Sequence, residues 1–191
     1  MIKSGSTGVI RLSRLTKGHI TAFKEEMQEA FLKGFQAYNH DDDEEANQWQ
    51  VLPDEDFYES LNAEGAEAYE AIGGDGRRVG GAIITIAPTS HQGELAFLYV
   101  KVGVQGKGIG QSIWRTIESL HPEVEVWETC TPYFDRRNIH FYINRCGFHA
   151  VEFFNEHHPD PHMPGQSRDG SRQSEHDDED GMFKFEKRMI K

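Results

Sequence analysis

The chain has 191 residues, of which 37% are hydrophobic, and its formal net charge is -12. Because a chain of this size buries about 70% of its unfolded surface, the composition excludes full disorder and dependence on a disulfide framework or structural metal. The acidic runs at 41–45 and 175–180 hold most of the excess charge, and no basic stripe is left for a phosphate backbone, so nucleic acid is excluded as a partner.

The first part of the chain is predicted to form a strand and two helices. Apolar and basic residues alternate over Val9–Leu15 at the period of a strand. From Ile20 to near Tyr38, apolar residues recur every three or four positions, which predicts an amphipathic helix. Pro53 then opens a short helix that runs through Leu61, because proline at a first helical position costs no hydrogen bond.

Three strands are predicted next, one directly after another. Ala66–Ile72 and Val79–Ile86 flank the sequence GGDG at 73–76, which is typical of a hairpin turn. Glu94–Val102 is a third strand, rich in Leu, Phe, Tyr and Val.

From there on, helices and strands alternate. The segment 157–181 is a loop longer than compact domains usually tolerate. The element order predicts a single domain, residues 1–191, with a mixed sheet covered by helices. The remaining elements are a helix at Gly108–His121, a strand at Val124–Thr129, a helix at Asp135–Arg145 ended by Gly147, and strands at Phe148–Asn155 and Met182–Met189.

The most informative segment is Leu98–Gln111, LYVKVGVQGKGIGQ, in which a strand runs through four glycines into a helix. Unpaired N–H groups converge there at the positive end of the helix dipole, so the segment predicts an anion site. The dinucleotide fingerprint needs a third glycine at Gln111, and the nucleotide loop fails because Gly108 follows Lys107. A tight connection without a ligand is the plain alternative.

The spacing that fits is [QR]xxGx[GA], from Gln105 to Gly110, and here the chain resembles the GNAT superfamily of acetyl-CoA-dependent acyltransferases. The sequence NIHFYINRCGF, Asn138–Phe148, is similar to a later helix and strand of that family. The resemblance runs from about Val9 to Phe154 and resumes at the last strand, whereas the long loop departs from it.

The resemblance implies an α/β (α+β) fold with a single mixed, mostly antiparallel sheet of about seven strands flanked by helices. In that fold the central strands ending at Val102 and Thr129 splay apart, and the pantetheine arm of acetyl-CoA lies in the gap. The implied cofactor-binding residues are Leu98, Tyr99, Val100, Gln105, Gly106, Lys107, Gly108, Ile109, Gly110, Gln111 and Asn138.

The implied reaction is direct acetyl transfer to an amine, with a proton for the departing thiolate. Tyr142 matches the family's proton-donating tyrosine, but it lies five residues before Gly147 where the family usually has four, which would place Ile143 there. A one-residue shift turns a helix by about 100°. Either the helix end carries an extra residue or another group is the acid, with Tyr133 and Tyr99 as alternatives. An ordinary core tyrosine is also compatible.

Two glutamates are candidate bases that act through a water. Glu94 begins the central strand and is the predicted catalytic base, and Glu128 ends the next strand. A solvated surface carboxylate is the alternative for each. A desolvated amine can also lose its proton to water directly.

No metal cofactor is expected. His157, His158 and His162 lie close together, but Pro159 and Pro161 prevent the helix that would align them as ligands.

The acidic runs fall where this family borders its acceptor groove, which favours a cationic amine such as a polyamine, an aminoglycoside or a lysine-bearing peptide. Solvated acidic tracts are the alternative. We expect an N-acetyltransferase that uses acetyl-CoA and a small-molecule or peptide primary amine. A non-catalytic acetyl-CoA sensor or regulatory module is the alternative function, transfer of a longer acyl group is a second, and a homodimer is left open.

A cytoplasmic protein without a membrane partner is expected. The longest apolar stretch, Ala82–Ala87, is far shorter than the roughly 20 residues that span a bilayer. The amino end lacks the pattern of a secretory signal. Cys130 and Cys146 are too few for a disulfide framework and are predicted to pack as small apolar groups.

Overall fold

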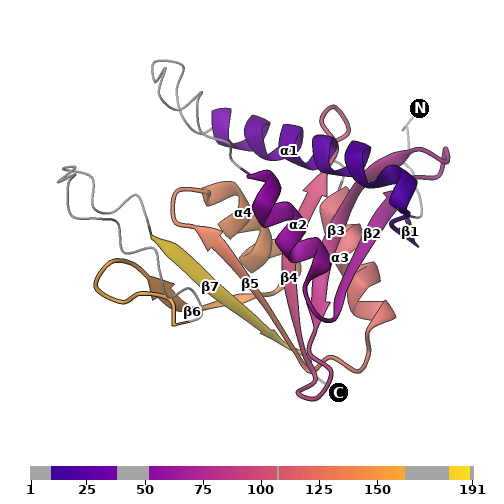
Figure 1. The fold of residues 1–191 in the computed structure, drawn as a ribbon. Coiled ribbons are helices and arrows are strands. Elements are labelled where there is room, and N and C mark those ends of the chain that lie inside the picture. Colours follow the sequence, from indigo (N-terminus) through magenta and orange to yellow (C-terminus); the bar gives the residue numbers. More distant parts are fainter. Residues whose placement is uncertain (1–9, 38–51, 107, 162–180, 190–191) are drawn as a thin grey trace, which may run out of the picture. The chain divides into compact units, whose positions relative to one another are not determined.

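The computed structural model describes residues 10–37, 52–106, 108–161 and 181–189 (Figure 1). The chain divides into two compact units, Met1–Glu125 and Val126–Lys191. Both acidic runs, His162 and Lys107 lie outside the described residues.

The first unit is built on an antiparallel sheet of four strands in the order β1-β2-β3-β4. The predicted hairpin is present, because Gly73 and Gly76 close the turn between β2 and β3 with main-chain hydrogen bonds. The strands span Arg11–Arg14 (β1), Ala66–Ile72 (β2), Arg78–Ile86 (β3) and Gln92–Val100 (β4). These bounds lie within a few residues of the predicted ones.

Helices cover both faces of this sheet. Gly80 and Gly81 are neighbours on β3, so their missing side chains would point to opposite faces. A Cβ on Gly81 would lie 2.3 Å from the ring of Phe23 on α1, and one on Gly80 would lie 3.1 Å from Ile113 on α3. Side chains of α1 and α3 therefore pack directly against the main chain of β3. The helical segments are Lys17–His19 (η1), Ile20–Gln36 (α1), Asp54–Asn62 (α2) and Ile109–Leu120 (α3).

The core of the first unit lies between α1, α2 and the sheet. Phe23, Met27, Phe57, Ile83 and Tyr99 are almost fully buried there. The rings of Phe23 and Tyr99 meet edge to face with centroids 5.2 Å apart. Burial of each such side chain contributes about 1.5–3 kcal/mol, which holds α1 firmly on β3 and β4.

A β-bulge interrupts β4. Ile83 and Ile84 are consecutive on β3, but their partners are Phe97 and Leu95, so Ala96 is an extra residue on β4. A bulge of this kind re-aims the backbone and side chains that follow it.

The second unit contains a three-stranded antiparallel sheet in the order β5-β7-β6. Trp127, Phe148 and Phe185 are completely buried in it. Its elements are Val126–Pro132 (β5), Arg136–Phe141 (α4), a π-helical turn at Tyr142–Cys146 (η3), His149–Phe154 (β6) and Met182–Arg188 (β7).

Several expectations remain predictions at this stage: the single domain over residues 1–191, the divergence of the two central strands, and the cytoplasmic location. Among the described residues, no helix has the length and apolar character needed to cross a bilayer. Both cysteines were predicted to pack as small apolar groups. This prediction is wrong for Cys130, which is exposed on β5, whereas Cys146 is buried as predicted.

Candidate functional site

The glycine-rich turn after β4 is open on its outer side. Gly103, Gly106 and Gly108 have φ of 88°, 82° and 72°, in the region that favours glycine. A Cβ at any of the three would meet nothing within 4 Å. A ligand can therefore reach the main chain of the turn without displacing a neighbouring group.

The turn leads directly into α3, with Gly108 as the residue before the first helical position. The first intrahelical hydrogen bond that closes there runs from the N–H of Ser112 to the carbonyl of Gly108, over 3.0 Å. The amides of Ile109 and Gly110 precede that bond, at the end where an α-helix offers no internal acceptor. Together with the positive end of the helix dipole, such amides favour an anionic ligand.

Gln105, the first residue of the family motif, supports the turn from within. Its side-chain Nε2 donates to the carbonyl of Val100, the last residue of β4, over 3.3 Å. The N–H of Val104 also donates to the carbonyl of Lys101, over 3.3 Å. These two bonds fold the start of the turn back onto the strand. The sequence alone did not indicate this use of the Gln105 side chain.

The strand residues expected to face the cofactor lie on β4, paired with β3. Leu98, Tyr99 and Val100 are opposite Ala82, Gly81 and Gly80. The side chain of Tyr99 points into the core beneath α1, and its hydroxyl donates to Glu26 over 3.2 Å. Burial raises the pKa of Tyr99 far above its ordinary value. The hydroxyl of Tyr99, one of the alternative proton donors, is thus hydrogen-bonded to Glu26 on α1.

Glu94 lies near the start of β4, opposite Thr85 on β3. Its side chain is exposed, and it precedes the bulge residue Ala96 by two positions. A carboxylate in this place is accessible to water, as a base that acts through a water requires.

The spacing of Tyr142 is explained by the π-helical turn. The N–H of Gly147 donates to the carbonyl of Tyr142, five residues earlier, where an α-helix would bond four residues apart. The turn accommodates one extra residue at the helix end. Tyr142 is 7% exposed and Ile143 is 40% exposed. The extra residue expected under the first alternative is thus present, and the role of Tyr142 as the acid stays a prediction.

The hydroxyl of Tyr142 lies by two threonines of β5. Thr129 and Thr131 are both buried. Burial raises the pKa of Tyr142 well above its ordinary value, and the two threonines oppose this effect without overcoming it. The phenol therefore keeps its proton at neutral pH.

The end of the helical segment that carries Tyr142 is tied to the last strand. Lys187 on β7 donates from Nζ to the carbonyl of Cys146, over 2.6 Å. A lysine at this position satisfies a terminal helix carbonyl and complements the negative end of the dipole. The ring of Tyr142 also packs against Phe148 and Phe185, with centroids 5.7 and 5.9 Å away.

Asn138 is held by the residue that caps α4. Its main-chain N–H and its side-chain Nδ2 donate to the two carboxylate oxygens of Asp135, over 2.9 and 2.7 Å. Burial raises the pKa of Asp135. The second alternative acid, Tyr133, is 43% exposed and packs edge-on against Phe153.

The other candidates are engaged in local pairs. Glu128 forms an ion pair with Lys184 of β7 over 3.0 Å. His157 and His158 lie 2.9 and 2.8 Å from Glu156 and Glu152. Within the part of the chain that the structure describes, no three His, Cys, Asp or Glu side chains are grouped as metal ligands.

The sequence pattern of the acetyltransferase (GNAT) family matches residues 25–148. The chain belongs to this family. An uncharacterized protein of Bacillus subtilis (strain 168), YrkN, is 44% identical over 141 residues, which are 74% of this chain and 75% of that protein.

Solved structures of acetyltransferases have the same fold. The PaiA N-acetyltransferase of Thermoplasma acidophilum, solved with coenzyme A, is 16% identical, with a TM-score of 0.62 over 94% of this chain and 99% of that one. The spermidine N-acetyltransferase of Vibrio cholerae, solved with CoA and spermine, is 11% identical, with a TM-score of 0.61 over 94% and 95% of the two chains. The predicted GNAT fold, family and enzyme class are confirmed.

Proposed function

We propose that this acetyltransferase transfers the acetyl group of acetyl-CoA to the primary amine of a cationic small molecule or peptide. The observation that carries the proposal is the open glycine turn at the start of α3. Three glycines there leave the main chain accessible, and the amides of the first helical turn offer donors at the positive end of the dipole. A diphosphate fits this donor set better than a neutral ligand does.

The first unit would hold the coenzyme. Gln105, Gly106, Lys107, Gly108, Ile109, Gly110 and Gln111 are the proposed diphosphate site, and Leu98, Tyr99 and Val100 the proposed main-chain partners of the pantetheine arm. Acetyl-CoA supplies a thioester whose carbonyl carbon is open to attack by an amine. Asn138 is a further proposed contact of the coenzyme.

Two side chains would move the protons. Tyr142 would donate its phenolic proton to the thiolate that departs when the carbon–sulfur bond breaks. The phenol is protonated at neutral pH, as an acid must be before it can donate. Glu94 would accept, through a water, the proton that the amine gives up as the new carbon–nitrogen bond forms.

The cationic acceptor is supported by charge. The chain carries a net charge of -12, which concentrates amines near its surface and repels anionic acceptors. One fold neighbour is named as a spermidine N-acetyltransferase, and polyamines are among the amines that we propose. The feature that left a non-catalytic sensor open was the spacing of Tyr142, and the π-helical turn accounts for that spacing.

The proposal is tested in two steps. Calorimetry with CoA and acetyl-CoA should show binding to the purified protein, and release of free thiol should then be followed with a panel of polyamines, aminoglycosides, lysine-containing peptides and neutral amino acids. Thiol release that depends on a cationic amine supports the proposal. Absence of CoA binding, or binding without turnover on any amine, would overturn it.

A further inference from the structure

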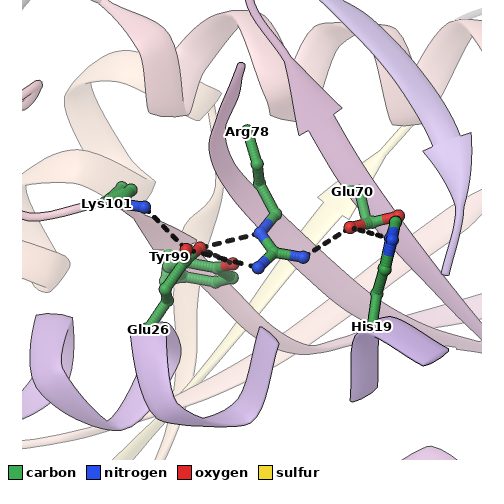
Figure 2. A network of polar contacts seen from close by, with 6 residues as sticks. All are labelled: His19, Glu26, Glu70, Arg78, Tyr99 and Lys101. Carbon is green, nitrogen blue, oxygen red and sulfur yellow. Dashed lines mark hydrogen bonds and ion pairs between the residues drawn. The ribbon is translucent and has the colours of Figure 1, made fainter. Parts of the chain in front are cut away.

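The carboxylate of Glu26, in the middle of α1, collects hydrogen bonds from three residues near the end of β4 and the start of β3. Oε1 accepts from Nζ of Lys101 at 2.7 Å, and Oε2 accepts from Nε of Arg78 at 2.8 Å. Arg78 gives a second bond to Oε1 at 3.2 Å, and the hydroxyl of Tyr99 gives one to Oε2. Figure 2 shows the carboxylate at the centre of these contacts.

The cluster continues through Arg78 to a second carboxylate. Arg78 also pairs with Glu70 of β2, which His19 of η1 contacts at 3.0 Å from the other side (Figure 2). The side chains of Glu26 and Arg78 are only 16% and 14% exposed. Burial by itself raises the pKa of Glu26, but the bonds from Arg78 and Lys101 outweigh it and hold that pKa below its ordinary value. Glu26 is therefore a fixed anion at neutral pH.

Lys101 connects this cluster to the glycine turn. It directly follows β4, and its N–H donates to the carbonyl of Val79 over 2.9 Å, which extends the pairing of β4 with β3 by one residue. Its own carbonyl accepts the bond from Val104 that starts the turn. The main chain of Lys101 is thus the last paired point of the strand, and its side chain is fastened to α1.

A turn with this composition needs such an anchor. Glycine loses more conformational freedom on ordering than any other residue, and Gly103, Gly106 and Gly108 lie within six positions of each other. Amides that are already ordered bind an anion more tightly than the same amides in a mobile segment. The mobile segment must lose conformational entropy on binding, and this cost reduces its affinity.

We infer that Glu26 is a positioning residue for the coenzyme turn and that it acts through the side chain of Lys101. The inference rests on the proposed function for its effect on coenzyme binding, but not for its effect on the order of the turn. A rival explanation is that Lys101, whose side chain is 41% exposed, is itself a phosphate ligand. The two explanations predict different changes in coenzyme affinity for Glu26→Gln. That variant releases the Lys101 side chain, which keeps its positive charge, so binding should weaken if Lys101 is an anchor and should not weaken if Lys101 is a phosphate ligand.

The first experiment measures hydrogen exchange of the amides in residues 101–111 without any nucleotide. Glu26→Gln and Lys101→Met should each speed exchange there by about fivefold or more. The double variant should add little to either, because both variants remove the same contact between Glu26 and Lys101. Lys24→Met is the matched control, since Lys24 lies on the same helix but pairs with Asp54 of α2. Unchanged exchange in both test variants would overturn the inference.

The second experiment measures coenzyme affinity and turnover. Glu26→Gln and Lys101→Met should raise the Kd for CoA and the KM for acetyl-CoA by about tenfold with little change in kcat. Lys101→Arg should restore most of the affinity, because a guanidinium can also reach the carboxylate. Unchanged or tighter binding by Glu26→Gln would overturn the inference in favour of a direct phosphate contact.

The two experiments separate the inference from the proposed function. If wild-type protein does not bind CoA, the proposed function fails. The hydrogen-exchange experiment still decides whether the contact between Glu26 and Lys101 orders the glycine turn. If Glu26→Gln unfolds because it leaves Arg78 with one carboxylate fewer, Lys101→Met, at a more exposed site, decides the exchange result alone.

Discussion

Gly147 donates its N–H to the carbonyl of Tyr142, five residues earlier, and this single bond reconciles the spacing of the tyrosine with its burial. An α-helical end would reach back only four residues, to Ile143. The extra residue instead widens one turn, and the phenol remains against Thr129 and Thr131. π-helical turns are frequent at functional sites, which makes the tyrosine a specific target for testing.

Tyr142→Phe should lower kcat by about 10²-fold or more while leaving the Kd for CoA unchanged, because only the proton for the thiolate is lost. The free energy of unfolding should fall by no more than about 1 kcal/mol, since one hydroxyl leaves the threonine pair. Tyr133→Phe is the control and should retain turnover. A Tyr142→Phe protein with full activity would show that the tyrosine is a core residue only. Steady-state kinetics and calorimetry provide the comparison.

Gly81→Ala should destabilise the first unit by about 1–3 kcal/mol, as overpacking in a core does. The new Cβ would lie 2.3 Å from the Phe23 ring and 2.6 Å from the carbonyl oxygen of Tyr69. Gly74→Ala, at a position with nothing within 4 Å, should change the free energy of unfolding by less than about 0.5 kcal/mol. Urea titrations of both variants check the difference, and equal stabilities would contradict the close approach of α1.

Gly108→Ala and Gly34→Ala should shift stability in opposite directions, although neither new methyl group has a neighbour within 4 Å. Gly108 has a φ of 72°, so alanine there costs about 1 kcal/mol and should also raise the KM for acetyl-CoA. Gly34 lies within α1, where alanine should stabilise by about 0.5–1 kcal/mol. Thermal melts compare the two, and a stabilising Gly108→Ala would argue against the left-handed turn.

The contribution of Glu26 to stability should depend on pH. Its pKa is lowered in the folded protein from an ordinary value of 4.5. A lowered pKa means that the stabilisation is fully present above the unfolded pKa and is lost as pH falls through the folded pKa. Wild-type protein should therefore exceed Glu26→Gln in stability at about pH 7, and the gap should narrow below about pH 4.5. A gap that is constant with pH in denaturant titrations would indicate that the carboxylate charge is not involved.

The strands and the glycine turn could be predicted because their signals are local. The GGDG turn between β2 and β3 and the glycines before α3 lie within short windows of sequence. The bulge at Ala96 could not be predicted, since an alanine in the middle of LAFLY carries none of the glycine or proline signals that mark irregular strands.

The spacing of Tyr142 was visible in the sequence as an irregularity, but the sequence could not say whether the helix widened or a different side chain took its place. The contact between Glu26 and Lys101 joins residues 75 positions apart, and no periodic pattern reports a pairing of that kind. Cys130 was expected to be buried but is exposed on β5. The sequence could not decide this, because a small residue on a strand can lie on the buried or on the exposed face of the sheet.

The bond from Lys187 to Cys146 gives the final strand a role beyond closing a sheet. The ammonium group lies on β7, and it holds the helical segment that carries the phenol. Lys187→Met would remove this bond while leaving every proposed coenzyme contact in place. A loss of turnover in that variant would therefore trace to the position of the tyrosine and not to the coenzyme turn.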